Sequence, residues 1–232
     1  MKIAGSVALV TGTSRGIGRH FAAQLAERGA KVYATARDPR QIDVPGVEKL
    51  ALDITDPDSI ATVAAAAGDV DLLVNNAGIS LYQNLITGDL DKIRTELDTH
   101  FWGTLGVIRA FAPVLGRNGG GAILNVLSAM SWFSYDGANS YSVAKAAEWA
   151  LTNGVRLELA KQGTLVTALH MGAVDTDMMA GFDIPKLDPA DVARAALDGI
   201  EQGSLEVLAD DWSRQAKTAV TDPATFYPNV AR

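Results

Sequence analysis

The stretch VALVTGTSRGIG, from Val7 to Gly18, decides the fold, because a short apolar run passes through a glycine-rich turn into a helical pattern. Gly12 permits the tight turn, Gly16 lets the backbone approach a pyrophosphate, and Gly18 allows close packing of helix on sheet. The free N–H groups and positive dipole end of the helix favour phosphates. A glycine-rich turn is weak evidence alone, but the flanking strand and helix are the context that a dinucleotide site requires. The turn residues expected to contact the cofactor are Gly12, Ser14, Arg15, Gly16, Ile17 and Gly18.

Short apolar runs alternate with helical patterns along the rest of the chain. The runs are mostly continuous in hydrophobicity, which is typical of parallel strands buried on both faces. The alternation predicts an α/β, single-domain Rossmann fold: a doubly wound parallel sheet of about seven strands with helices on both faces. The expected strands are Val7–Gly12, Lys31–Ala36, Val47–Asp53, Asp71–Gly78, Ala122–Ser128, Thr164–Met171 and Leu205–Ala209. The expected helices are Ile17–Glu27, Asp56–Ala67, Asp89–Leu115, Ser140–Lys161 and Asp188–Gln202.

No linker, repeat or charge block divides the chain, so residues 1–232 are expected to form one domain. The segment of about 177–188 is short and predicts a small loop over the substrate. The tail of about 218–232 contains two prolines and no clear periodicity. We expect this tail to be ordered only against a neighbouring subunit.

Composition excludes several classes of protein. The net charge of -7 argues against nucleic acid or an anionic membrane as a partner. With no cysteine and three histidines far apart in the sequence, disulfides, cysteine catalysis and a metal site are not expected. The apolar run near the N-terminus is too short to span a membrane. These features predict a cytoplasmic protein.

The end of the second expected strand bears on the choice of dinucleotide. An acidic residue there usually binds the ribose hydroxyls of NAD, but this chain has Ala36 followed by Arg37. Arg37 and Arg15 are suited to bidentate binding of a ribose 2′-phosphate. NADP is therefore favoured over NAD. The alternatives are two solvated surface arginines, and Asp38 binding a ribose if the strand ends later.

Three further motifs complete a recognisable set: NNAG at Asn75–Gly78, the serine Ser128, and YSVAK at Tyr141–Lys145, where Tyr141 follows Ser128 by 13 positions. With the glycine turn, this set resembles the short-chain dehydrogenase/reductase family in its compact single-domain form. The resemblance covers nearly the whole chain and implies one dinucleotide-binding and catalytic domain that transfers a hydride between NADP(H) and a carbonyl or alcohol. It also implies a homodimer or homotetramer, since the family pairs the helices equivalent to Asp89–Leu115 and Ser140–Lys161.

The resemblance assigns roles to individual residues. Ser128, Tyr141 and Lys145 would be the catalytic group, with Tyr141 and Lys145 also contacting the cofactor. Asp53 would contact the adenine, with Ile54 beside it. Further cofactor contacts would come from Asn75, Ala77, Gly78, Gly172, Val174 and Thr176.

The chemistry of the catalytic group also follows from the residue types. Hydride transfer to a carbonyl builds negative charge on its oxygen, so a donor must deliver a proton there. A tyrosine hydroxyl has a pKa near 10, and a lysine ammonium one helical turn away lowers it. Ser128, at a strand end, can hydrogen-bond the same oxygen. In reverse, the phenolate of Tyr141 would act as general base.

Two positions depart from the family pattern. His100 stands where many members have an asparagine that holds a water in a proton relay. An imidazole can also donate and accept, so His100 is either a replacement in the relay or a buried histidine without a kinetic role. Met171 stands where the family often has proline before Gly172, which leaves the backbone freer there.

Aromatic and methionine side chains near the proposed centre predict an apolar pocket for a hydrophobic small molecule. Met130, Trp132 and Met178 are the substrate candidates, with Ser128. The alternative is that about half of these side chains simply close the local core. Two other functions remain open: a non-catalytic NADP-binding sensor or scaffold, and an isomerase or dehydratase using the same group. The substrate and the physiological direction do not follow from the sequence.

Overall fold

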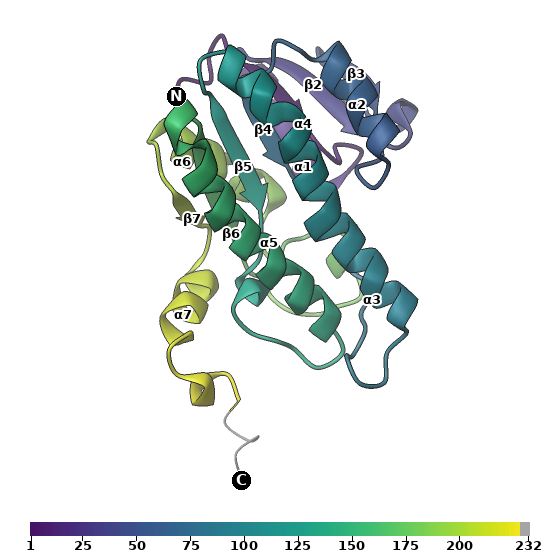
Figure 1. The fold of residues 1–232 in the computed structure, drawn as a ribbon. Coiled ribbons are helices and arrows are strands. Elements are labelled where there is room, and N and C mark those ends of the chain that lie inside the picture. Colours follow the sequence, from purple (N-terminus) through teal and green to yellow (C-terminus); the bar gives the residue numbers. More distant parts are fainter. Residues whose placement is uncertain (228–232) are drawn as a thin grey trace.

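A computed structural model describes residues 1–227 and places seven parallel strands in one sheet (Figure 1). The strand order is β3-β2-β1-β4-β5-β6-β7, so the chain reverses direction across the sheet between β1 and β4. The strands are β1 (Val7–Val10), β2 (Lys31–Ala36), β3 (Glu48–Ala51), β4 (Leu72–Asn75), β5 (Ala122–Val126), β6 (Leu165–His170) and β7 (Glu206–Leu208). The Rossmann fold predicted from the sequence is confirmed.

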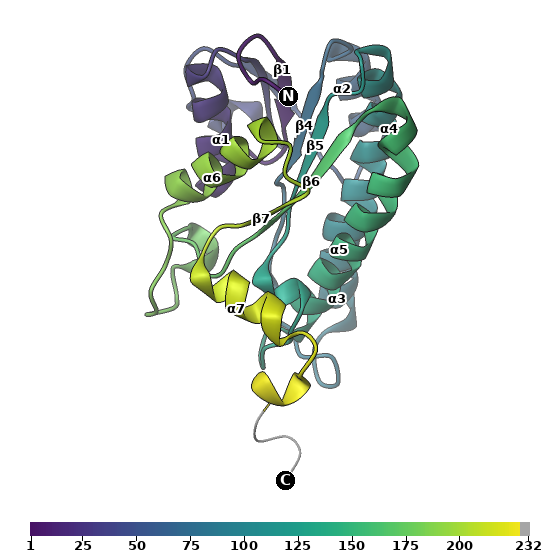
Figure 2. The ribbon, with the colours of Figure 1, turned by 90° about the vertical axis from the view of Figure 1, so that its left-hand side faces the viewer.

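Helices cover both faces of the sheet, as Figure 2 shows in edge view. Successive strand residues point to opposite faces. Ala8 and Val10 pack beneath α1 and α6, whereas Leu9 packs in the second core beneath α2, α4 and α5. The helices are α1 (Gly16–Glu27), α2 (Pro57–Ala66), α3 (Leu90–Leu97), α4 (Thr104–Arg117), α5 (Asn139–Leu159), α6 (Pro189–Glu201) and α7 (Asp211–Ala219).

The expected helix Asp89–Leu115 is not one regular helix. Its middle, Asp98–Gly103, is a π-helical segment between α3 and α4. Such segments are rare and often occur at functional sites. This one contains His100, whose side chain is buried.

Helix α7 was not predicted from the sequence. Asp210 caps it by accepting a hydrogen bond from the Ser213 N–H at 3.0 Å, within a reciprocal capping box. The tail beyond α7 then packs on its own chain, where Phe226 stacks on Phe133 with ring centroids 4.9 Å apart. Up to Tyr227 the tail thus has contacts within its own chain, the expected role of a neighbouring subunit stays a prediction, and residues 228–232 lie outside the described part.

Among residues 1–227, no helix is long and apolar enough to cross a membrane.

Candidate active site

The glycine turn between β1 and α1 is built for close approach. Gly12 and Gly16 have φ angles of 72° and 57°, which favour glycine. A Cβ on Gly12 would lie 2.9 Å from Ala77 Cα, and a Cβ on Gly18 would lie 2.2 Å from Gly12 O. A side chain at either position would therefore displace backbone. The cradle left open at the start of α1 fits a dinucleotide pyrophosphate.

Asn76 joins this turn to the end of β4, a contact that the sequence did not single out within NNAG. Its Nδ2 donates to Thr11 O at 2.9 Å and to Gly12 O at 3.1 Å. In return, Thr11 Oγ1 accepts the N–H groups of Asn76 and Ala77. Asn75 Nδ2 donates to Asn125 Oδ1 on β5 at 2.8 Å, which ties the central strands together.

The end of β2, where the cofactor ribose is expected, is open to solvent. Strand β2 ends at Ala36, and the next residue, Arg37, is exposed. Asp38 accepts hydrogen bonds from the backbone N–H and the guanidinium of Arg40, at 2.8 Å to both guanidinium nitrogens. Asp38 is therefore occupied, whereas Arg37 faces solvent near Asp53, whose pKa is lowered first by the Thr55 hydroxyl and more weakly by Arg37.

Arg15 lies on the other side of this opening. Its guanidinium is 3.3 Å from the Asp177 carboxylate, and both side chains are about 70% exposed or more. An ion pair between two exposed side chains is weak, so Arg15 is available to a phosphate. Ile54, beside Asp53, is buried at the same edge of the sheet.

The turn after β6 closes the far side of the site. Gly172 N–H donates to the Asp210 carboxylate, with both oxygens at 3.3 Å. Thr176 Oγ1 donates to Val174 O at 3.3 Å, and its methyl group would lie 3.3 Å from a Cβ on Gly16. The structure thus brings Thr176, one of the expected cofactor contacts, against the glycine turn.

Ser128, Tyr141 and Lys145 converge at the carboxyl ends of the strands. Ser128 follows β5, and its Oγ accepts the Met130 N–H at 3.1 Å. Tyr141 and Lys145 occupy successive turns of α5, with the ammonium 5.8 Å from the tyrosine ring centroid. Lys145 Nζ is buried and donates to Val126 O at 2.7 Å and to Glu148 Oε2 at 2.7 Å.

Several charges act on the Tyr141 hydroxyl. Burial raises the pKa of Tyr141 most strongly, and the carboxylates of Glu148 and Glu96 add to this, whereas Lys145 and a hydrogen bond with Ser128 lower it. The sum of these effects raises the pKa of Tyr141 above its usual value. Lys145 acts in the expected direction, but burial outweighs its effect.

His100 lies against the same group. Its Nε2 is 2.8 Å from Ile79 O, its Nδ1 is 3.5 Å from Glu148 Oε2, and its ring meets that of Tyr141 edge-on with centroids 5.5 Å apart. A Cβ on Gly78 would lie 2.6 Å from the imidazole, so glycine there makes room for the ring. Nε2 thus has a hydrogen-bond partner in Ile79 O, whereas Nδ1 makes no hydrogen bond among the described residues and has the Glu148 carboxylate as its nearest acidic group.

Two buried glutamates at the centre were missed from the sequence. Glu148 is three residues after Lys145 on the same face of α5, a placement that was visible in the predicted helix. Glu96, fully buried on α3, accepts the Leu81 N–H with Oε1, while Oε2 has no partner among the described residues.

The substrate candidates take different positions. Trp132 is half-buried and stacks on the buried His170 ring with centroids 4.0 Å apart. Burial lowers the pKa of His170 to about 4, and the ring is neutral at neutral pH. Met178 is 37% exposed, and its carbonyl accepts a hydrogen bond from the Tyr82 hydroxyl.

A hollow of about 530 Å³ opens beside Asn84–Thr87, Ser134, Asp136 and Asn139.

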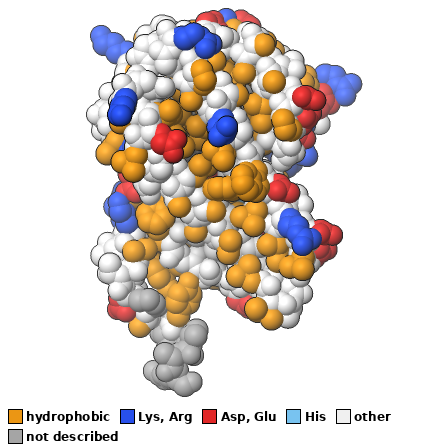
Figure 3. Space-filling model, viewed as in Figure 1, with side chains coloured by type: hydrophobic (Ala, Val, Ile, Leu, Met, Phe, Trp, Pro, Cys, Tyr) orange, Lys and Arg blue, Asp and Glu red, His pale blue; other side chains and the backbone are white. Residues whose placement is uncertain are grey.

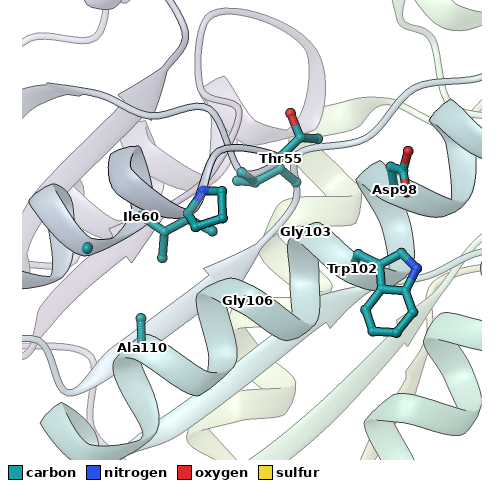
Figure 4. Close-up of a pocket in the computed structure, with 10 residues that line it drawn as sticks. Thr55, Ile60, Asp98, Trp102, Gly103, Gly106 and Ala110 are labelled. Carbon is teal, nitrogen blue, oxygen red and sulfur yellow. The ribbon is translucent and has the colours of Figure 1, made fainter.

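A second hollow, of about 560 Å³, lies away from Tyr141 on the α2 and α4 side (Figure 4). Trp102 forms one wall, Thr55 and Ile60 form another, and Gly103, Gly106 and Ala110 line the helix between them. The small residues leave this groove open along the surface of α4.

The comparison with known proteins agrees with the fold and the motifs. The family model for short chain dehydrogenases matches residues 6–185. The chain therefore belongs to the short-chain dehydrogenase/reductase family of oxidoreductases.

Relatives match over most of their length. An uncharacterised oxidoreductase of Staphylococcus saprophyticus is 34% identical over 215 residues, covering 85% of this chain and 92% of the relative. A short chain dehydrogenase from Burkholderia cenocepacia, solved in complex with NADP, is 34% identical with a TM-score of 0.95, and both chains are covered completely. A short-chain dehydrogenase from Sphingobium yanoikuyae, in complex with NADPH, is 25% identical with a TM-score of 0.82, covering 98% of this chain and 96% of that one.

Proposed function

We propose that this protein is an NADP-dependent ketone reductase or alcohol dehydrogenase acting on a hydrophobic small molecule. The observation that carries the proposal is the convergence of Ser128, Tyr141 and Lys145 beside the glycine turn. The bound cofactor supplies or accepts the hydride. The chain's own residues then have to place the substrate oxygen and handle its proton.

Tyr141 is the proton donor in this mechanism. In reduction its hydroxyl donates to the oxygen that gains negative charge, and Ser128 donates a second hydrogen bond that fixes this oxygen. The raised pKa of Tyr141 keeps the phenol protonated at neutral pH, which suits reduction. Alcohol oxidation needs the phenolate, so its rate is expected to rise as the pH rises toward that pKa.

Lys145 holds positive charge beside the phenol. An ammonium has three N–H donors, and two are used by Val126 O and Glu148. The third donor is left for a ribose hydroxyl of the cofactor, which would place the nicotinamide end of the site next to Tyr141.

The preference for NADP rests on Arg15 and Arg37. Both are exposed at the ribose edge, Asp38 is held by Arg40, and the relatives from Burkholderia and Sphingobium were solved with NADP or NADPH. Phosphate binding by arginine is charge-assisted and bidentate. Where an NAD site has one acidic residue for the ribose hydroxyls, this chain has the guanidinium groups of Arg15 and Arg37.

Arg37→Ala is expected to raise the KM for NADPH by about 10- to 100-fold, because a hydrogen bond to a charged group contributes about 1.5–3 kcal/mol. The KM for NADH should stay within about twofold. Steady-state kinetics with both cofactors measure this, and Arg117→Ala, an exposed arginine at the far end of α4, is the control. Equal losses with NADPH and NADH would contradict the role of Arg37.

A screen of NADPH and NADH oxidation against ketones and aldehydes tests the function itself. Apolar side chains are exposed near the entrance, among them Ile86 at 96%, Ile184 at 49% and Phe182 at 39%. We therefore expect turnover with bulky apolar carbonyls. Cofactor binding without turnover of any carbonyl would favour a sensor, and turnover of a substrate without net cofactor oxidation would favour an isomerase or dehydratase.

We also infer a homodimer or homotetramer through the outer faces of α4 and α5. Figure 3 shows hydrophobic side chains spread over this side of the molecule. Leu157 on α5 is 79% exposed, and Trp102, in the π-helical segment just before α4, is 60% exposed. Light scattering is expected to give a mass of two or four chains, and Leu157→Lys is expected to lower it. A monomeric wild-type protein would contradict the inference.

A further inference from the structure

Glu148 is an ionisable group that neither the fold nor the proposed proton donation requires. It lies in the middle of α5 with its side chain 2% exposed. A buried carboxylate is costly unless it is paired and hydrogen-bonded. Its contacts therefore indicate what it does.

Three elements provide partners for this carboxylate. Oε2 accepts from Lys145 Nζ at 2.7 Å and lies 3.5 Å from His100 Nδ1 in the π-helical segment. Oε1 accepts from Thr104 Oγ1, at the start of α4, at 3.2 Å. Both oxygens are thus engaged, and one of them lies between the lysine and the histidine.

The backbone of Glu148 is held as firmly as its side chain. Its carbonyl accepts from Thr152 Oγ1 at 2.8 Å, and Thr152 Oγ1 accepts from Asn125 Nδ2 at 2.9 Å. Asn125 in turn accepts from Asn75. The carboxylate is therefore fixed relative to the central strands of the sheet.

We propose that Glu148 is a positioning residue that holds the Lys145 ammonium against β5 and connects it to His100, so that His100, Glu148 and Lys145 form one buried polar path behind Tyr141. The inference rests on the proposed function, since it concerns the same proton. His100 is then part of the proton path, with Ile79 O at its other nitrogen.

The charges around the path set its expected pH behaviour. Burial would raise the pKa of Glu148, but Lys145 and then His100 lower it below its usual value. Burial would lower the pKa of Lys145, but Glu148 and Tyr141 raise it. Glu96 on α3 also acts on Tyr141, and it stays in place when Glu148 is changed.

Glu148→Gln keeps the shape and removes the charge. The positive charge of Lys145 is then uncompensated, so the first proton to leave the Tyr141–Lys145 pair should leave at lower pH. We expect the alkaline limb of the reduction pH profile to move down by about one pH unit. We also expect kcat to fall at least tenfold while the KM for the carbonyl stays within twofold.

A titration of the unliganded protein tests the same point without turnover. Tyrosine labelled with ¹³C at the ζ position reports the ionisation of Tyr141 by NMR, with Tyr141→Phe to assign its signal. Glu148→Gln should move this titration, whereas Glu158→Gln, an exposed glutamate on the same helix, should not. An unmoved titration together with wild-type kcat would overturn the proposal.

The link to His100 is tested by combining variants. If the two residues serve one path, the losses of kcat in His100→Asn and Glu148→Gln should be less than multiplicative in the double variant. Fully multiplicative losses would overturn the shared path.

Near-ultraviolet circular dichroism verifies that each variant is folded, and Glu148→Asp, which keeps the charge, should recover part of kcat. A wild-type protein without carbonyl turnover would instead refute the proposed function, leaving the titration as the test of Glu148.

Discussion

Tyr141→Phe is expected to lower kcat for carbonyl reduction by about a hundred- to ten-thousandfold, the range that a positioned acid or base contributes. The phenyl ring keeps its edge-on contact with His100 but cannot donate a proton. NADPH affinity should change little, because Tyr141 is only one of the expected cofactor contacts and the glycine turn and the arginines are untouched. Steady-state kinetics and a fluorescence titration with NADPH measure the two quantities separately.

The matched control is Tyr135→Phe, which removes a hydroxyl from a tyrosine that is 63% exposed in the loop before α5. Its kcat should equal that of the wild type. NADPH turnover that survives Tyr141→Phe would show that the proton comes from another group.

Lys145→Ala is expected to lower the free energy of unfolding by about 3–5 kcal/mol in addition to abolishing turnover. The reason is that removing one partner of a buried ion pair leaves the other charge uncompensated. Here the stranded group would be Glu148, whose remaining partners are Thr104 and His100. Urea denaturation at neutral pH measures the loss.

The double variant Lys145→Ala/Glu148→Gln separates stability from catalysis. Without the stranded carboxylate, much of the lost stability should return, while turnover should not. A single Lys145→Ala variant as stable as the wild type would contradict the buried pair.

The pH window of this pair follows from its two pKa directions. Glu148 has a lowered pKa, so its contribution to stability is present above the usual value of 4.5 and is lost as the pH falls through the folded pKa. Lys145 has a raised pKa, so its contribution is present below the usual value of 10.5 and is lost as the pH rises through the folded pKa. The destabilisation by Lys145→Ala should therefore be largest near neutral pH and smaller in acid.

The strands and most helices could be predicted because continuous apolar runs and caps such as Asp56-Pro57 act locally. The structure trims several expected strands, since the residues beyond Val10 and Asn75 leave the ladder to form the ligand-facing turns. Helix α7 was missed because it is short and mostly polar, with few apolar residues to reveal its helical period, and its cap at Asp210 is confirmed only by the contact with Ser213.

The candidate site could also be predicted in part, because several of its residues lie in local sequence motifs. Ser128, Tyr141 and Lys145 fall at strand and helix positions that the order of the sheet brings together. Glu148 and Glu96 were missed because charged residues in helices normally face solvent, and only tertiary packing makes them buried. Trp132 was expected near the substrate, and its half-buried side chain stacks on His170, a contact that the sequence did not indicate.

The π-helical segment Asp98–Gly103 also has a consequence for the phase of the long helix. A π turn holds one residue more than an α turn, so the helical phase changes between α3 and α4. Deleting one residue there would restore regular α-helical phase and rotate α3 by about 100° against α4, the angle of one residue at 3.6 per turn. Glu96 would then turn away from Leu81, and His100 could not face both Ile79 and Glu148. The inserted residue is what allows one helix to present a buried carboxylate and a buried imidazole to the same side of Tyr141.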